Sequence, residues 1–578
     1  MKRIFILLMA VAAMAMAQAK RPEQAKFIND NGTGRLMADE RPWLILGGEL
    51  GNSSASAPRD VAAIFPKLRD MGLNCVLVPA YWDLIEPEEG KFDFTTTDAV
   101  MDEALRNDLK VVFLWFGAWK NSMSCYAPEW LKRDYRKYPR ARTRDGKPLE
   151  IASAFSENVL RADSVAFTRW LSHTMERDTL ATVVMVQIEN EIGMLEDARD
   201  HSPLAEKEYA KGVPAALTEH LAKNRKALHP GIRKAWEEHG SRKSGSWEEV
   251  FGEGIYTDEY FMAWNYARYV ERLARAARQI TGVPLYVNAA MNSRGRKPGE
   301  YPSAGPLIHL KDIWHAGAPT LDFLSPDLYD KGFTDWTASY ATADNTLFIP
   351  EIQRCEGNAA QAFYVMGEHD AIGLSPFSIE NSHDGPDSSN VKGYRLLRQL
   401  IPLITRYQGK NDKKGTRDMQ GLYFDHDSTT RVLHKDGMKI TAAHFFTLPW
   451  DARAKEAVWP AAGGVLIRLA PREYILAGSG IVVKFENDGA GEDSRRLGED
   501  GFLESGDAAG SGSDVTGRKG KGEQRRVGIA GVSEVEIDDE GKMTPIRYFN
   551  GDETHQGRHV RIGVDDYRIL HIRLYEYE

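Results

Sequence analysis

One stretch decides how this chain folds, and it reads Val186-Gln187-Ile188-Glu189-Asn190-Glu191-Ile192-Gly193. It continues the mostly apolar run 182–188, a pattern typical of a strand that is buried on both faces of a parallel sheet. In barrels of alternating strands and helices, side chains at the carboxyl ends of the strands form the active site. Period-two alternation would place Glu189 and Glu191 on the same side, so the pattern does not choose between them.

The same alternation of strand-like and helix-like segments extends from Trp43 to about residue 381. Helical spacing of apolar residues predicts helices that include 58–71, 98–107, 160–176 and 260–280. Eight strand–helix units predict an α/β fold, a (β/α)8 TIM barrel, in which about 250 residues are typical and longer chains carry loop insertions. A Rossmann-type sheet is the alternative, but no Gly-rich phosphate turn follows the first strand. The other seven strands are expected at 44–46, 74–79, 110–116, 285–288, 321–326, 347–349 and 373–379.

Three regions depart from this pattern. Residues 195–255 are polar and are expected to form a mainly solvated insertion. From about residue 415, short alternating runs between turn residues predict a C-terminal antiparallel β domain, and residues 487–525 indicate a flexible Gly-, Asp- and Ser-rich excursion within it. We therefore expect a catalytic barrel over 35–410 and a β-sandwich-like domain over 415–578.

The first 19 residues predict a cleaved signal peptide and hence a periplasmic or secreted protein. Lys2 and Arg3 precede an apolar stretch that is shorter than the roughly 20 residues of a membrane span, and small-x-small cleavage sites follow it. We therefore expect no membrane insertion after cleavage. The net charge of −9 with scattered Lys and Arg disfavours nucleic acid as a partner. No cofactor or metal is expected, since the cysteines Cys75, Cys125 and Cys355 lack metal-ligand spacing.

A second carboxylate follows another buried run, because 347–349 leads into Pro350 and Glu351. Glycoside hydrolysis needs two carboxylates on opposite faces of the scissile bond, one protonated and one ionised, and a separation of about 5–5.5 Å gives retention of configuration. The ends of the fourth and seventh strands meet across a barrel mouth, so Glu191 and Glu351 could face one sugar. A single strand-end glutamate could equally be a solvated charge, but the pair with Asn190 is a rarer combination.

The runs 187–193 and 82–94 resemble the β-galactosidases of glycoside hydrolase family 35, in particular a bacterial branch with a β-rich C-terminal domain, over about residues 35–480. The resemblance implies a retaining exo-β-galactosidase that acts by double displacement on terminal β-galactosyl residues of oligo- or polysaccharides, such as hemicellulose side chains. It implies that Glu191 is the general acid/base, that Glu351 is the nucleophile and that Asn190 binds the 2-hydroxyl. Specificity for β-arabinosyl or β-glucosaminyl units, and a non-catalytic carbohydrate-binding protein, stay open as alternatives.

Four further residues are candidate sugar contacts. Trp119 and Asn121 follow the third strand, where an indole face can stack on a pyranose and an amide can bond a hydroxyl, although Trp119 could instead belong to the core. Glu49 follows the first strand and could line the pocket or lie in a solvated loop. Tyr329 follows the sixth strand. Resemblance to the wider clan of retaining glycosidases on (β/α)8 barrels implies that a tyrosine at this place forms a hydrogen bond with the nucleophile. The oligomeric state is not readable from the sequence.

Overall fold

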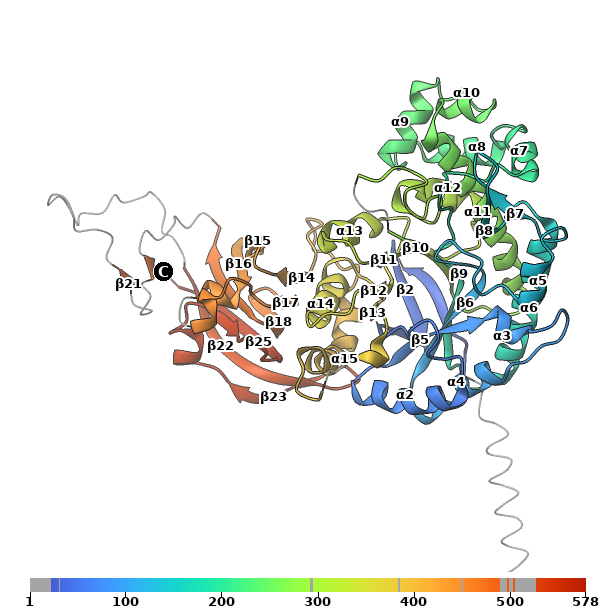
Figure 1. The fold of residues 1–578 in the computed structure, drawn as a ribbon. Helices are drawn as coiled ribbons and strands as arrows, with labels where there is room; N and C mark the ends of the chain where they lie inside the picture. The colour runs from blue at the N-terminus through green and yellow to red at the C-terminus, as the bar shows by residue number, and fades with distance from the viewer. Residues whose placement is uncertain are drawn as a thin grey trace, which may run out of the picture.

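The structure is a computed structural model that describes residues 22–30, 32–291, 295–382, 385–448, 451–488 and 526–577, with the short strands β20 (Arg496–Leu497) and β21 (Leu503–Glu504). The expected signal peptide lies outside these residues, and so does most of the excursion expected at 487–525. Within the described ranges, no helix has the length and apolar character needed to span a membrane. Figure 1 shows a barrel on one side of the molecule and β-sheets on the other.

The eight expected strands form one parallel sheet that closes into a barrel (Figure 1). The sheet closes between its first two strands, because Asn74 N donates to Leu46 O at 3.1 Å and Leu77 N donates to Gly48 O at 2.9 Å. The predicted (β/α)8 fold is therefore confirmed. Its strands, in their hydrogen-bonded order, are β4 (Ile45–Leu46), β13 (Gly373–Pro376), β12 (Ile349–Ile352), β11 (Phe323–Leu328), β10 (Leu285–Ala290), β9 (Val183–Asn190), β6 (Lys110–Lys120) and β5 (Cys75–Tyr81).

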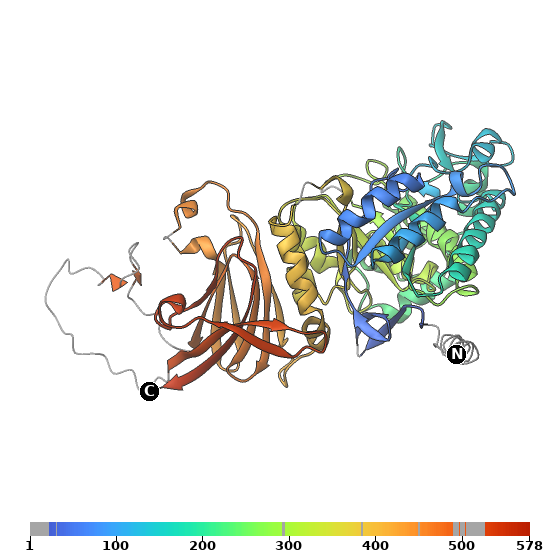
Figure 2. The same cartoon turned by 90° about the horizontal axis from the view of Figure 1, so that it is seen from below.

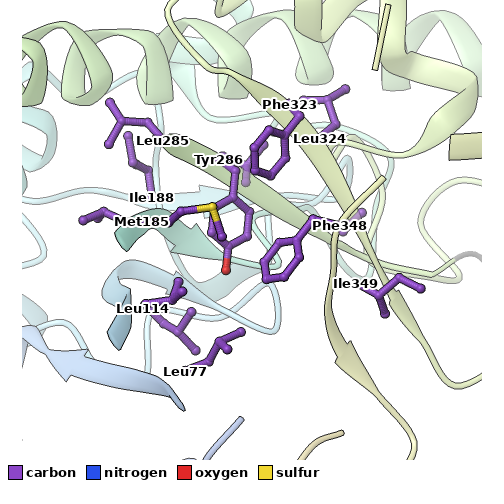
Figure 3. Close-up of a cluster of buried hydrophobic side chains, with 14 of the residues drawn as sticks. Leu77, Leu114, Met185, Ile188, Leu285, Tyr286, Phe323, Leu324, Phe348 and Ile349 are labelled. Atoms are coloured by element: carbon purple, nitrogen blue, oxygen red, sulfur yellow. The ribbon is translucent and has the colours of Figure 1, made fainter. Parts of the chain in front are cut away.

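Apolar side chains cover both faces of the sheet. Each strand is therefore a nearly continuous run of apolar residues. Figure 3 shows a buried cluster that draws on neighbouring strands, including Leu77, Leu114 and Met185. Tyr286 stacks on Phe323 with ring centroids 5.5 Å apart and meets Phe348 edge-on at 5.3 Å. A barrel packed in this way is no pore, so a site can form only at its ends.

Helices surround the sheet, and most of them follow the expected spacing of apolar residues. The longest, α11 (Ile255–Arg278), corresponds to the helix expected at 260–280. The others that cover the barrel are α2 (Pro58–Asp70), α4 (Thr95–Arg106), α6 (Glu157–Arg177), α12 (Lys311–Gly317), α13 (Phe333–Tyr340), α14 (Asn358–Glu368) and α15 (Ser389–Tyr407).

The polar insertion expected at 195–255 follows β9 and contains helices that the sequence analysis did not predict. Ser202 and Ser246 accept hydrogen bonds from the first turns of two of its helices, and Trp236 and Trp247 are buried among them. Each helix buries only a few apolar residues, so the average composition concealed the packing. The four helices are α7 (Pro203–Tyr209), α8 (Ala215–Asn224), α9 (Pro230–Glu238) and α10 (Trp247–Phe251).

A small antiparallel sheet that the sequence did not predict covers the amino-terminal end of the barrel. It consists of β1 (Lys26–Asp30), β2 (Thr33–Ala38) and β3 (Arg41–Trp43). Phe27 packs on Phe323 at the start of β11 with ring centroids 5.3 Å apart, and Lys110 at the start of β6 binds Asp39 at 3.1 Å. This sheet closes the end of the barrel that lies opposite the carboxyl ends of the strands.

The C-terminal part folds into two antiparallel sheets that share an apolar core, which includes Leu422, Leu476 and Ile481. Both sheets are antiparallel throughout, as the turn-rich pattern after residue 415 predicts. The larger sheet has the order β14 (Met419–Phe424), β17 (Ala462–Ala470), β18 (Glu473–Ser479), β25 (Arg568–Tyr577), β22 (Arg526–Ile537), β23 (Met543–Tyr548). The smaller has the order β15 (Thr430–Lys435), β16 (Met438–His444), β19 (Ile481–Asn487), β24 (Val560–Ile562).

The larger sheet packs on α14 and α15 of the barrel, as Figure 2 shows from below. A Cβ atom added to Gly367 of α14 would lie 2.9 Å from the Cα of Gly421, and one added to Gly463 would lie 2.6 Å from the carbonyl oxygen of Ala360. Arg431, on β15 of the smaller sheet, also binds Glu368 of α14 at 2.7 Å. The backbones of the two parts therefore meet so closely that only glycine fits at these positions.

Candidate active site

Two buried carboxylates lie at the carboxyl ends of the fourth and seventh barrel strands. Glu191 follows β9 directly and Glu351 lies within β12, and they are 5% and 4% exposed. Burial, and after it the negative charge of Glu351, raises the pKa of Glu191 to about 7. Near neutral pH, Glu191 therefore still holds a proton that it can donate.

Three polar groups fix Glu191. The Asn121 side-chain amide donates to its Oε2, Ser122 N donates to its carbonyl oxygen at 3.1 Å, and its own N–H donates to Asn288 Oδ1 at 2.9 Å. The structure thus places Asn121 beside the acid, at the end of β6. Asn288, on β10, was not anticipated from the sequence.

Glu189 faces a different group of residues from Glu191. The chain takes left-handed φ values of 60° at Glu189 and 47° at Glu191, so simple alternation does not hold at this strand end. Glu189 Oε2 accepts a hydrogen bond from Trp119 N at 2.7 Å. Burial, and after it the charge of Asp163 on α6, raises the pKa of Glu189 well above its ordinary value. This backbone geometry separates the two glutamates: the charge of Asp163 acts on Glu189, whereas the charge of Glu351 acts on Glu191.

Trp119 is part of the core, which is one of the two roles that its place in the sequence left open. It is fully buried, because β6 continues to Lys120 instead of ending at residue 116. Its indole ring meets the rings of Tyr266 and Tyr269 edge-on, with centroids 5.5 and 4.8 Å apart. No face of this ring is open to a pyranose.

We expect Trp119→Ala to act on stability rather than on sugar recognition. Removing a buried Trp from a packed core lowers the free energy of unfolding by about 3–5 kcal/mol. Denaturant unfolding followed by circular dichroism measures the loss. If the variant unfolded like the unmodified protein but bound sugar poorly, the core assignment would be wrong.

Tyr329 lies against the second carboxylate. Its hydroxyl donates a hydrogen bond to Glu351 Oε1, and its side chain is partly exposed just beyond β11. Glu351 Oε2 is buried and has no hydrogen-bond partner in the part of the chain that the structure describes. The phenol of Tyr329 therefore holds one oxygen of Glu351, and the carboxyl group of Glu49 lies close to the same side chain.

Two more acids complete the group. Glu49, beyond β4, and Asp327, paired in register with Glu351 on the adjacent strand, are both fully buried. Burial, and after it the charge of Glu351, raises the pKa of each well above its ordinary value. Asn190 is also buried, and neither atom of its amide has a partner among the described residues. Glu49 and Asn190, two of the candidate sugar contacts, are thus buried near these acids, whereas Asp327 was not among the candidate residues.

One cation accompanies these acids. Lys120, the last residue of β6, is 4% exposed, and its Nζ lies 5.1 Å from the centroid of the Phe116 ring. Burial acts to lower the pKa of Lys120, but the charges of Glu351 and Glu191 outweigh it and the pKa is raised. A lone lysine after a tryptophan gives no signal in the sequence, so Lys120 was not predicted. Over the described ranges, no group of His, Cys, Asp and Glu is arranged to hold a metal ion.

Two family models match parts of this chain. A beta-galactosidase model, glycoside hydrolase family 42, matches residues 56–253, and a model of a domain of unknown function, DUF5597, matches residues 391–561. The first segment contains Glu191 and the second covers much of the C-terminal sheets. The first match shows similarity to β-galactosidases over residues 56–253, whereas the resemblance to family 35 stays a prediction.

A curated relative and several solved structures are also similar. A beta-galactosidase from Xanthomonas manihotis is 28% identical over 210 residues, 35% of this chain and 32% of that protein, so the match spans about a third of the relative. The beta-galactosidase of the psychrophilic Marinomonas ef1 is 15% identical with a TM-score of 0.43, over 64% of this chain and 61% of that one. The cold-adapted beta-galactosidase of Rahnella sp. R3 is 16% identical with a TM-score of 0.45, over 66% and 58%.

Proposed function

We propose that this chain is an exported retaining β-glycosidase that removes terminal β-galactosyl residues from oligo- or polysaccharides. The observation that carries the proposal is the juxtaposition of Glu191, with a pKa of about 7, and Glu351 at the ends of two barrel strands. Glycoside hydrolysis with retention needs one protonated and one ionised carboxyl group of this kind. The β-galactosidase family match over 56–253 supports the same chemistry and the choice of sugar.

The proposed reaction is a double displacement. Glu351 attacks the anomeric carbon while Glu191 gives its proton to the glycosidic oxygen, so the leaving alcohol departs and a glycosyl ester forms on Glu351. Ester formation removes the negative charge of Glu351, and this lowers the pKa of Glu191. Glu191 then takes a proton from water, which attacks the anomeric carbon, releases the sugar with its original configuration and restores Glu351.

The surrounding groups suit a sugar in this position. In the proposed complex, Asn190 bonds the 2-hydroxyl through its unpartnered amide, and Glu49 contacts another hydroxyl. Asn121 and Tyr329 orient the two catalytic carboxylates through the hydrogen bonds that they already make. Residence in the periplasm or outside the cell, after removal of residues 1–19, belongs to the same proposal.

The activity should fall on the alkaline side of neutral pH. Glu191 must be protonated in the first step, and with a pKa of about 7 the protonated fraction falls as the pH rises through that value. We therefore expect kcat/KM for a galactoside with a poor leaving group to decline about tenfold per pH unit above the pKa. Initial rates across the neutral range measure this limb. A galactoside with an activated leaving group needs little proton donation, so its kcat/KM should decline less.

A panel of aryl β-glycosides tests the function directly. We expect the highest kcat/KM on the β-galactoside, and proton NMR should show the β-anomer of galactose as the first product. Preference for a β-arabinoside or β-glucosaminide would keep the mechanism and change the sugar. Sugar binding without turnover at high enzyme concentration would favour the non-catalytic alternative, and the α-anomer as first product would exclude retention.

A further inference from the structure

Lys120 occupies a fixed position at the centre of the candidate site. Its N–H donates to Met123 O at 2.8 Å and its carbonyl accepts from Met123 N at 3.0 Å, so a tight turn holds its main chain. It pairs in register with Asn190 on the neighbouring strand. Its side chain passes the ring of Phe116, which leaves the ammonium group at the carboxyl end of the barrel.

Acids surround this ammonium group from several strands. Their charges act on it from Glu351 on β12, Glu191 after β9, Glu49 after β4 and Asp327 on β11. Yet no hydrogen bond or ion pair within 4 Å joins Lys120 Nζ to any residue that the structure describes. The three N–H donors of this ammonium group are therefore left for a molecule that binds at this end of the barrel.

We propose that Lys120 binds the substrate, and that its ammonium donates hydrogen bonds to hydroxyl groups of the sugar unit held between Glu191 and Glu351. This inference rests on the proposed glycosidase function and names a sugar-binding residue that the sequence did not reveal. The hydroxyl oxygens supply acceptors for the donors that no described protein group uses.

Deoxygenated substrates give a test specific to a direct contact. We would measure kcat/KM for an aryl β-galactoside and for its 2-, 3-, 4- and 6-deoxy analogues with the unmodified protein, Lys120→Met and Lys120→Arg. On the parent substrate we expect Lys120→Met to lose on the order of 10²-fold, as when one charged or oriented donor is removed from an active site. On the analogue that lacks the contacted hydroxyl, Lys120→Met and the unmodified protein should differ far less.

Lys110→Met is the matched control, because Lys110 begins the same strand, β6, and binds Asp39 at the far end of the barrel. We expect this variant to keep the kcat/KM of the unmodified protein on every substrate. Lys120→Arg keeps the charge and should regain part of the activity that Lys120→Met loses. If Lys120→Met does not fold, Lys120→Arg becomes the test variant. Its donors lie at different positions from those of the ammonium group, so its loss of kcat/KM should be smallest on the analogue that lacks the contacted hydroxyl.

Two outcomes would overturn the inference. Equal losses on all five substrates would show that Lys120 acts only on the structure of the site, and unchanged kcat/KM in Lys120→Met would show that it does not act at all. Calorimetric binding of galactose separates this inference from the proposed function. If the unmodified protein bound galactose without hydrolysing any β-glycoside, the function would fail, whereas weaker binding by Lys120→Met would still support the contact.

Discussion

Glu351→Gln should lower kcat on an aryl β-galactoside by on the order of 10⁴-fold or more, the scale seen when a catalytic nucleophile is removed. The amide keeps the size of the side chain and can still accept from Tyr329, so the fold and the hydrogen bond to Oε1 should persist. It cannot form the glycosyl ester, because an amide is a far weaker nucleophile than a carboxylate. Steady-state kinetics with highly purified protein measure the loss.

Two controls accompany this variant. Glu356→Gln changes an exposed glutamate five residues further on and should leave kcat unchanged. A 2-deoxy-2-fluoro-β-galactoside with a good leaving group should trap the ester on the unmodified protein, and peptide mass spectrometry should locate the label on Glu351. A label on Glu191 would reverse the two roles, and full activity in Glu351→Gln would refute the mechanism.

Glu191→Ala should show a loss that depends on the leaving group. General acid catalysis contributes typically 10²–10⁴-fold, so kcat/KM for a galactoside with a poor leaving group should fall by about that factor. With an activated aryl galactoside the first step needs little proton donation, so that loss should be small and breakdown of the ester should limit the rate. The decline of kcat/KM at pH values above the Glu191 pKa of about 7 should disappear in this variant.

Azide identifies the step that Glu191 assists. It needs no general base, so it should restore turnover of the activated substrate by Glu191→Ala and yield the β-galactosyl azide, with retained configuration. An inverted azide from this variant would show that Glu191 is the nucleophile. Glu189→Gln is the matched control: an amide resembles the protonated acid that accepts from Trp119 N, so we expect it to keep most of the activity.

The barrel could be predicted because its strands are apolar on both faces and end in polar residues. The sequence alone could not choose between Glu189 and Glu191, since the choice depends on two left-handed backbone positions that L-residues rarely adopt. Trp119 was a candidate sugar contact because the third strand, β6, was expected to end at residue 116. The four additional residues of the strand place both Trp119 and Lys120 among buried groups.

Other features lack a local signal in the sequence. Asn288 and Asp327 matter through their contacts with residues on other strands: Asn288 Nδ2 donates to Asp327 Oδ2 at 2.6 Å, and Asn288 Oδ1 accepts from Glu191 N. The helices at 203–251 bury few apolar residues each, and the sheet at 26–43 has strands of only three to six residues. The positions of such elements are decided by tertiary contacts rather than by periodicity.

The glycine contacts between α14 and the larger C-terminal sheet bear on how this protein could be engineered. α14 follows the strand that carries Glu351, and its Gly367 fits directly against Gly421. A barrel expressed without the sheets would expose to solvent the apolar face of α14 that normally packs on them. Exposed apolar faces of this kind promote aggregation. Anyone who wishes to fuse the barrel to a foreign protein should therefore transfer the barrel and the C-terminal sheets together.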